Sequence, residues 1–193
     1  MKKIGIKLGI FVLLIVMLIA CKQHHTPKAR GYFRIDLPEK EYQAFNQSFP
    51  YTFEYPKYAK AIPDTSSNAE AYWLNLIFSE FNGQVHISYK PVGDNFNMLM
   101  EDSRKLAYKH SVKADAIGEH LFYDAEKKVT GVLYEIKGDA ASPMQFYATD
   151  SLNHFIRGSL YFNAIPNQDS LAPVIKFVHE DIIHLMETLR WND

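Results

Sequence analysis

The sequence predicts an α+β fold, built on a mostly antiparallel sheet of about six or seven strands and flanked by two helices. Three observations predict this fold. The sequence has stretches rich in β-branched and aromatic residues, short turn-like links between these stretches, and two longer segments with helical spacing of apolar residues. The stretches expected to form strands are residues 51–55, 72–79, 84–90, 120–124, 129–137, 144–150 and 154–163. The expected order along the chain is a group of strands, a helix, a second group of strands and a C-terminal helix. This order is typical of α+β proteins and not of parallel α/β proteins.

Side-chain alternation within these stretches indicates a sheet with one wetter face. Val85, Ile87 and Tyr89 alternate with polar residues, so the two sets of side chains point to opposite sides of the strand. Four short links join consecutive strands, and we expect each link to close an antiparallel hairpin. The links are residues 82–83, 124–128, 138–143 and 151–153.

Two segments carry apolar residues three and four positions apart, which places them on one face of a helix. The first begins near Asp94, and its apolar positions are Phe96, Leu99, Met100, Leu106 and Ala107. The second ends near residue 189, and its apolar positions are Leu171, Val174, Ile175, Val178, Ile182, Leu185, Met186 and Leu189. We expect Ser170 to cap it and Pro173 to lie in its first turn. Both helices should lie on the sheet, an outline that resembles the Mog1/PsbP-like folds by analogy.

The first twenty residues have the layout of a secretory signal peptide, residues 1–20. A basic head with three lysines precedes an apolar run over residues 8–20. That run is shorter than the ~20 residues that a membrane-spanning helix needs, so spanning is the weaker interpretation. At its end, residues 18–21 (LIAC) resemble the bacterial lipobox. This resemblance implies cleavage before Cys21 and attachment of lipid there, with acyl chains such as palmitate as the membrane anchor.

Cys21 has two other interpretations, an uncleaved membrane helix with a spare cysteine and a metal site shared with His24 and His25. The short apolar run argues against the first. The second lacks the three or four ligands, held in tetrahedral geometry, that zinc prefers. As a lipid anchor, Cys21 leaves the mature chain without a thiol, which excludes disulfides and cysteine nucleophiles.

The chain is expected to consist of the signal peptide, a lipidated tether over residues 21–31, and a single α+β domain over residues 32–193. The polar tether would have a reach of ~17 Å if its ten residues after Cys21 are flexible. Removal of residues 1–20 leaves 173 residues and takes away three lysines, so the formal charge changes from −1 to −4. An acidic domain lacks the excess of Lys and Arg that binds phosphates, and no nucleic-acid partner is expected.

Three motifs contain residue types found in catalytic or ligand sites. In HEDIIH, His179 and His184 are five positions apart and lie about 140° apart around a helix, whereas the zinc-protease signature needs a spacing of four. Asp150, Ser151 and His154 combine the residue types of a serine hydrolase, but neighbouring residues of this kind are typical of a turn. The GDAASP loop lacks the lysine and second glycine of a phosphate-binding loop. We therefore expect no catalytic residue, metal site or cofactor.

His110 follows Leu106 by four positions and continues the apolar face of the first helix. It is expected to be a core or boundary histidine, with a functional role as the alternative. Arg104, Lys113 and Asp115 surround it in the sequence. This charged segment is either a solvated helix end, where cations favour the C-terminus, or a surface that binds a partner.

Three long stretches carry the resemblance of this chain to a known family. They are RGYFRIDLPEKEY (30–42), AYKHSVKADAI (107–117) and NQDSLAPVIKFVHEDIIHLMETLRW (167–191). Through them the chain resembles the gliding motility lipoprotein GldD family of Bacteroidota, from the lipobox to the last helix. The resemblance implies a small lipoprotein needed for surface gliding and for the type 9 secretion system that works with it. No enzymatic activity, cofactor or catalytic residue is established for this family, so the resemblance implies that the protein is not an enzyme.

The favoured hypothesis is a membrane-anchored component or assembly factor that binds other gliding motility or secretion proteins. Candidate contacts with such a partner are Tyr32, Arg34, Asp36, Arg104, His110, Lys113 and Asp115. The alternative is a periplasmic domain that binds a lipid or glycan between sheet and helices, which an enclosed apolar pocket would favour. Lys22 and Gln23 follow Cys21 without the acidic run that marks many Bacteroidota lipoproteins for surface export. The domain is therefore expected to face the periplasm, at the outer membrane in preference to the inner.

Overall fold

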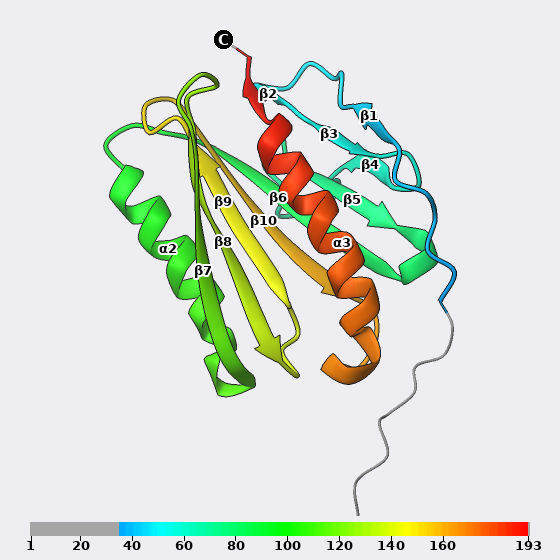
Figure 1. Cartoon of the computed structure of the whole chain (residues 1–193). Helices are drawn as coiled ribbons and strands as arrows, with labels where there is room; N and C mark the ends of the chain where they lie inside the picture. Colours follow the sequence, from blue (N-terminus) through cyan, green and yellow to red (C-terminus); the bar gives the residue numbers. More distant parts are fainter. Residues whose placement is uncertain (1–34, 193) are drawn as a thin grey trace, which may run out of the picture. The chain divides into compact units, whose positions relative to one another are not determined.

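The predicted antiparallel sheet is present in the computed structural model, which describes residues 35–192 (Figure 1). Within these residues it has seven strands in the order β4-β5-β6-β10-β9-β8-β7, and every neighbouring pair is antiparallel. The strands are β4 (Lys60–Pro63), β5 (Leu74–Phe78), β6 (Gly83–Pro91), β7 (Ala114–Asp124), β8 (Val129–Gly138), β9 (Met144–Thr149) and β10 (His154–Phe162). The α+β fold predicted from the sequence is confirmed.

All four predicted hairpins are present, as the pairs β5–β6, β7–β8, β8–β9 and β9–β10. A further pair joins β6 to β10, from His154 opposite Pro91 to Phe162 opposite Gly83. It connects the first three strands of the sheet to the last four. The sheet is continuous because of this long-range pair.

Residues 51–55 do not form one strand as expected. Instead β2 (Tyr51–Thr52) pairs with β11 (Arg190–Trp191), and β3 (Glu54–Pro56) pairs with β1 (Tyr42–Ala44). Phe53 lies between β2 and β3 and is buried in the core, so this stretch packs across the core while its two halves take different partners. The sequence did not predict β1, β4 and β11, because strands of two to four residues are too short to show alternation.

Two helices lie where helical spacing predicts them, α2 (Phe96–Tyr108) and α3 (Gln168–Thr188). Short 3₁₀ turns, η1 (Ser79–Phe81) and η2 (Lys109–Val112), follow β5 and α2. The prediction that Ser170 caps α3 is wrong: Asn167 is the cap, and its side chain accepts a hydrogen bond from the Ser170 backbone N–H at 3.1 Å. The helix therefore begins earlier than expected, and Pro173 lies in its second turn, where its ring removes one helical hydrogen bond.

The two helices cover opposite faces of the sheet. Leu133 of β8 belongs to the core cluster that includes Val178 of α3, whereas its neighbours Val132 and Tyr134 pack with Ala107 of α2. Successive side chains of a strand point to opposite faces, so α3 and α2 lie on different sides of β8. Figure 1 shows α3 in front of the sheet and α2 beside and behind it.

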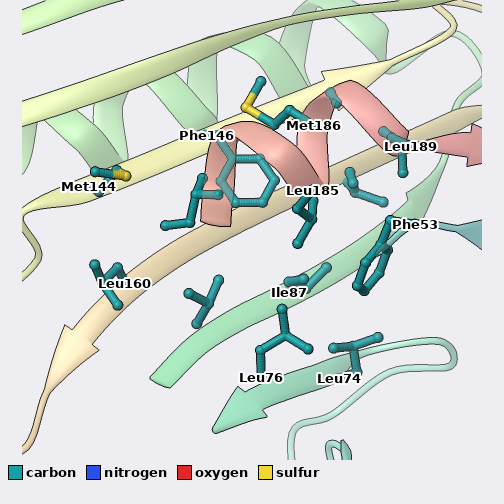
Figure 2. Packing of buried hydrophobic residues seen from close by; sticks show 14 of the residues in the cluster. Phe53, Leu74, Leu76, Ile87, Met144, Phe146, Leu160, Leu185, Met186 and Leu189 are labelled. Carbon is teal, nitrogen blue, oxygen red and sulfur yellow. The ribbon is translucent and has the colours of Figure 1, made fainter. Parts of the chain in front are cut away.

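The main core lies between the sheet and α3. Phe146, Leu160 and Ile87 of the sheet meet Leu185 and neighbouring side chains of α3 there, as Figure 2 shows. Each fully buried side chain of this size stabilises the fold by about 1.5–3 kcal/mol. None of the helices in residues 35–192 combines the length and hydrophobicity needed to cross a membrane.

We predict that Gly131→Ala destabilises the fold by at least about 1–3 kcal/mol in urea unfolding, as overpacking does. A Cβ at position 131 would lie 2.2 Å from the Tyr147 carbonyl oxygen, a backbone atom of the neighbouring strand. Gly93→Ala is the matched control, because a Cβ there meets nothing within 4 Å. Equal stability of the two variants would show that β8 and β9 are not packed as described.

Candidate functional site

Asp181 of α3 is a buried carboxylate that binds the segment leading into β1. Its side chain accepts hydrogen bonds from Lys40 Nζ at 2.7 Å, Tyr42 Oη at 3.0 Å and Tyr58 Oη at 2.5 Å. Only 2% of Asp181 is exposed. We call Lys40, Tyr42, Tyr58 and Asp181 the Asp181 cluster. Burial and the neighbouring carboxylate raise the pKa of both phenols, so they stay protonated as donors.

The Asp181 cluster is enclosed by aromatic side chains. Lys40 Nζ lies 3.8 Å from the centroid of the Phe177 ring and donates to the Phe177 carbonyl at 2.7 Å. The Tyr42 ring stacks on His184, with ring centroids 3.7 Å apart. Cation–π and stacking contacts of this kind add to the charge-assisted hydrogen bonds. The N-terminal segment, blue in Figure 1, is therefore fixed alongside α3 by interactions more than a hundred positions apart in the sequence.

The two histidines of the HEDIIH motif face different neighbours, as their spacing predicts. His179 Nε2 lies 2.8 Å from Glu135 Oε1 of β8, although the contact lacks hydrogen-bond geometry. His184 Nε2 lies 2.8 Å from Glu54 Oε2 of β3. Within residues 35–192 no three His, Cys, Asp or Glu side chains are grouped so that they could hold a metal.

The Asp150–His154 segment is a hairpin turn, as the residue types indicate. Asp150 Oδ1 accepts hydrogen bonds from the backbone N–H groups of residues 152, 153 and 154, and Ser151 has a left-handed backbone with φ of 67°. The carboxylate is used to order the turn. His154 points elsewhere, with Nδ1 3.0 Å from the Tyr89 hydroxyl.

The structure describes five of the seven candidate partner contacts. Tyr32 and Arg34 lie outside the described residues, as does Cys21, and Asp36 is exposed near the start of the described chain. The other four, Arg104, His110, Lys113 and Asp115, occupy the end of α2, η2 and the start of β7.

Within this second group, three residues are exposed and one is not. Arg104, Lys113 and Asp115 lie at the surface. His110 is half-buried, and burial together with the nearby Arg157 lowers the pKa of its imidazole. The prediction of a boundary histidine agrees with this position.

An exposed stripe that was not predicted from the sequence lies beside this group on the edge strand β7. Tyr108 of α2 donates to Glu119 Oε1 at 2.8 Å, and the Arg104 guanidinium lies 4.7 Å from the centroid of the Tyr108 ring. Leu121 and Tyr123 continue on the same face of β7 and are 86% and 76% exposed. We call Tyr108, Glu119, Leu121 and Tyr123 the β7 patch. Alternation along 119–123 was a usable signal, but only the sheet order shows that β7 is an edge strand.

We predict that Asp181→Asn lowers the free energy of unfolding by about 3 kcal/mol, because the partly buried Lys40 ammonium then loses its ion pair with the buried carboxylate. The matched control is Glu180→Gln. Glu180 lies 3.6 Å from the same ammonium, but its side chain is 57% exposed, so its removal should change the stability by less than about 1 kcal/mol. Urea unfolding of both variants measures the difference. Similar losses in both would contradict the assignment of the buried charge to Asp181.

Comparisons with known proteins bear on the chain as a whole. The model of a protein family described as gliding motility lipoprotein GldD matches residues 22–191. No curated protein matches the sequence. Among solved structures, the solution structure of cyanobacterial PsbP (CyanoP) from Synechocystis sp. PCC 6803 is similar at 6% sequence identity and a TM-score of 0.47, covering 83% of this chain and 98% of that one. Since the family match spans nearly the whole sequence, the chain belongs to the gliding motility lipoprotein GldD family.

Proposed function

We propose that this envelope lipoprotein is a non-enzymatic adaptor of the gliding motility and type 9 secretion machinery, and that its β7 patch binds another protein component. Membership of a gliding motility lipoprotein family supports a role in gliding motility. The free edge of the sheet supports the binding mode. β7 has eleven residues and, among the strands of residues 35–192, pairs only with β8.

An edge strand of this length leaves unpaired backbone N–H and C=O groups that can accept a strand from another chain. Exposed Leu121 and Tyr123 supply an apolar surface beside this edge, and such surfaces mark sites of protein interaction. The partner that fits is an extended protein segment. Its backbone would pair with β7 while apolar side chains on one face would cover Leu121 and Tyr123.

The Asp181 cluster binds the first described residues of the chain to elements other than β7. Lys40, in the segment before β1, donates to Asp181 of α3, and Tyr58, which lies just before β4, donates to the same carboxylate. In the strand order, β4 and β7 are the two opposite edges of the sheet. A partner paired with β7 would therefore lie at the edge opposite β4, the strand that follows Tyr58.

For location, we propose attachment at the outer membrane with the domain facing the periplasm. The absence of an acidic run after Cys21 in the sequence supports the periplasmic side. Fractionation of the envelope by density, with the accessibility of the domain to external protease, tests both parts of this proposal.

The alternative of a carrier that encloses a lipid or glycan is not favoured by the core. The space between the sheet and α3 is filled by aromatic and aliphatic side chains (Figure 2). Two hollows of about 250 and 270 Å³ flank the Glu135–His179 pair, and both are open to the surface. The adaptor hypothesis agrees better with a filled core and an exposed apolar patch.

We predict that the double variant Leu121→Asp/Tyr123→Asp abolishes colony spreading while the protein level in immunoblots stays normal. The two charges would make covering the patch unfavourable but would not disturb buried residues. The matched control is Leu152→Asp/Ile165→Asp, at positions that are 73% and 89% exposed elsewhere on the domain. Normal spreading of the β7 variant, or equal loss in the control, would contradict the proposed surface.

A further inference from the structure

A surface groove of about 680 Å³ lies where β5 ends, β6 begins and β10 ends. Val85 and Leu160 belong to the core under α3, so the side chains next to them in their strands, Gln84, His86 and Tyr161, point to the other side of the sheet. These three side chains line the groove, which is therefore distinct from the filled space between the sheet and α3. Its volume falls within the ~300–1,000 Å³ typical of sites for small ligands.

Neighbouring strands bring three lining side chains into one row. Gln84 of β6 lies opposite Ile77 of β5 on one side and Tyr161 of β10 on the other. All three are partly exposed. Cross-strand partners share a face, and their side chains lie close together. An apolar side chain, an amide and an aromatic ring are thus side by side in the groove.

A chain of hydrogen bonds holds the polar side chains of this face in place. His86 Nδ1 lies 2.6 Å from Asn75 Oδ1, and His86 Nε2 lies 2.8 Å from Gln84 Nε2. An amide oxygen accepts and an amide nitrogen donates, so both contacts fit a neutral imidazole with its hydrogen on Nδ1. The His86 ring also packs edge-on against Tyr161, with ring centroids 5.8 Å apart. A ligand would meet groups that are already oriented, which reduces the entropy lost on binding.

The rim of the groove is ordered by hydrogen bonds between its two sides. Asn82 Nδ2 donates to the Asn163 carbonyl at 2.7 Å, and the Asn163 backbone N–H donates to the Asn82 carbonyl at 2.8 Å. Gln84 Oε1, the Tyr161 hydroxyl and the Asn163 side-chain amide make no hydrogen bond to other residues in the part of the chain that the structure describes. The groove therefore offers both donors and acceptors to a ligand.

The composition of the lining disfavours an ion and an added peptide strand. Among the described residues that line the groove, none is Asp, Glu, Lys or Arg. An ionic ligand would therefore lose part of its hydration without gaining a charged partner. β6 and β10 each pair with strands on both sides, so their backbone groups are not available to extend the sheet. A ligand must be recognised by the amide, imidazole, hydroxyl and aromatic side chains.

We propose that this groove binds a neutral oligosaccharide. Each sugar hydroxyl both donates and accepts, which matches amide and phenol groups that do the same. The C–H groups on the face of a sugar ring form an apolar surface that packs on an aromatic ring, and Tyr161 and Phe162 supply such rings in the groove. The β7 patch lies at the edge of the sheet, so this site does not depend on the adaptor function.

Titration of the full chain in a nonionic detergent, followed by the NMR signals of the Gln84 and Asn163 side-chain amides, tests the site. The probes are maltotriose, cellotriose and tri-N-acetylchitotriose, with sorbitol as a control that has hydroxyl groups but no sugar ring. We expect saturable movement of these signals with at least one trisaccharide, at a Kd of about 1 mM or lower, and none with sorbitol. A preference for tri-N-acetylchitotriose indicates an N-acetylated glycan, and a preference for either glucose trimer indicates a glucan.

Tyr161→Ala should raise this Kd roughly tenfold, because it removes a ring on which the sugar packs. Tyr123→Ala, at an exposed tyrosine of β7, is the matched control and should leave the Kd unchanged. Asn163→Asp, at an exposed position, keeps the size of the side chain but replaces a donor amide with a carboxylate, and it should also raise the Kd.

Equal loss of binding in both tyrosine variants would overturn the proposal, as would an unchanged Kd in both Tyr161→Ala and Asn163→Asp. The absence of saturable movement with all three trisaccharides at roughly ten times the expected Kd would overturn it without a variant.

Discussion

The pairing of β6 with β10 is the contact on which the arrangement of this domain depends. It joins strands that lie more than sixty positions apart at their closest ends, and it places the β7–β8–β9 group on the far side of β10. Because β10 takes the position beside β6, the strand that follows α2 in the chain becomes an edge of the sheet. The exposed edge at β7 is thus a consequence of the topology.

The same pairing decides what each helix covers. α3 closes the apolar face, where Val85, Ile87 and Leu160 lie. α2 covers part of the other face, which carries Arg157, Gln145 and Ser159 from the central strands. One face therefore supplies most of the hydrophobic stabilisation, and the other keeps polar groups partly enclosed.

The buried carboxylate of Asp181 and the half-buried guanidinium of Arg157 have different partners. Asp181 has an ammonium and two phenols as donors, so its charge is satisfied within the domain and fixes the N-terminal segment to α3. Arg157 has one amide oxygen and no carboxylate among the described residues. The carboxylate of Asp181 therefore helps to hold the first described residues of the domain in place.

The sequence predicted the features that depend on local pattern. The four hairpins follow from alternation and short links, and the two helices from apolar spacing. Asp181 was missed because a carboxylate in a helix suggests an exposed position, although it lies three positions after Val178 and one before Ile182 on the buried face. Its partners, Lys40 and Tyr58, come from segments without periodic pattern.

Edge and interior strands were not distinguishable, because strand order depends on contacts distant in the sequence. The position of the β7 patch at an edge of the sheet could therefore not be predicted before the fold was known. β2 and β11 are too short to show alternation in the sequence. They pair with each other, and Tyr51 of β2 is buried in the core.

Photo-crosslinking in the native envelope tests most directly whether β7 is the docking surface. A crosslinking amino acid would replace Leu121 in one strain and the exposed Leu152 in another, each with and without Cys21→Ala. We expect position 121 to capture a specific motility or secretion protein, position 152 not to capture it, and the anchorless form to lose it. The same products from both positions, or no protein from position 121, would contradict the adaptor function.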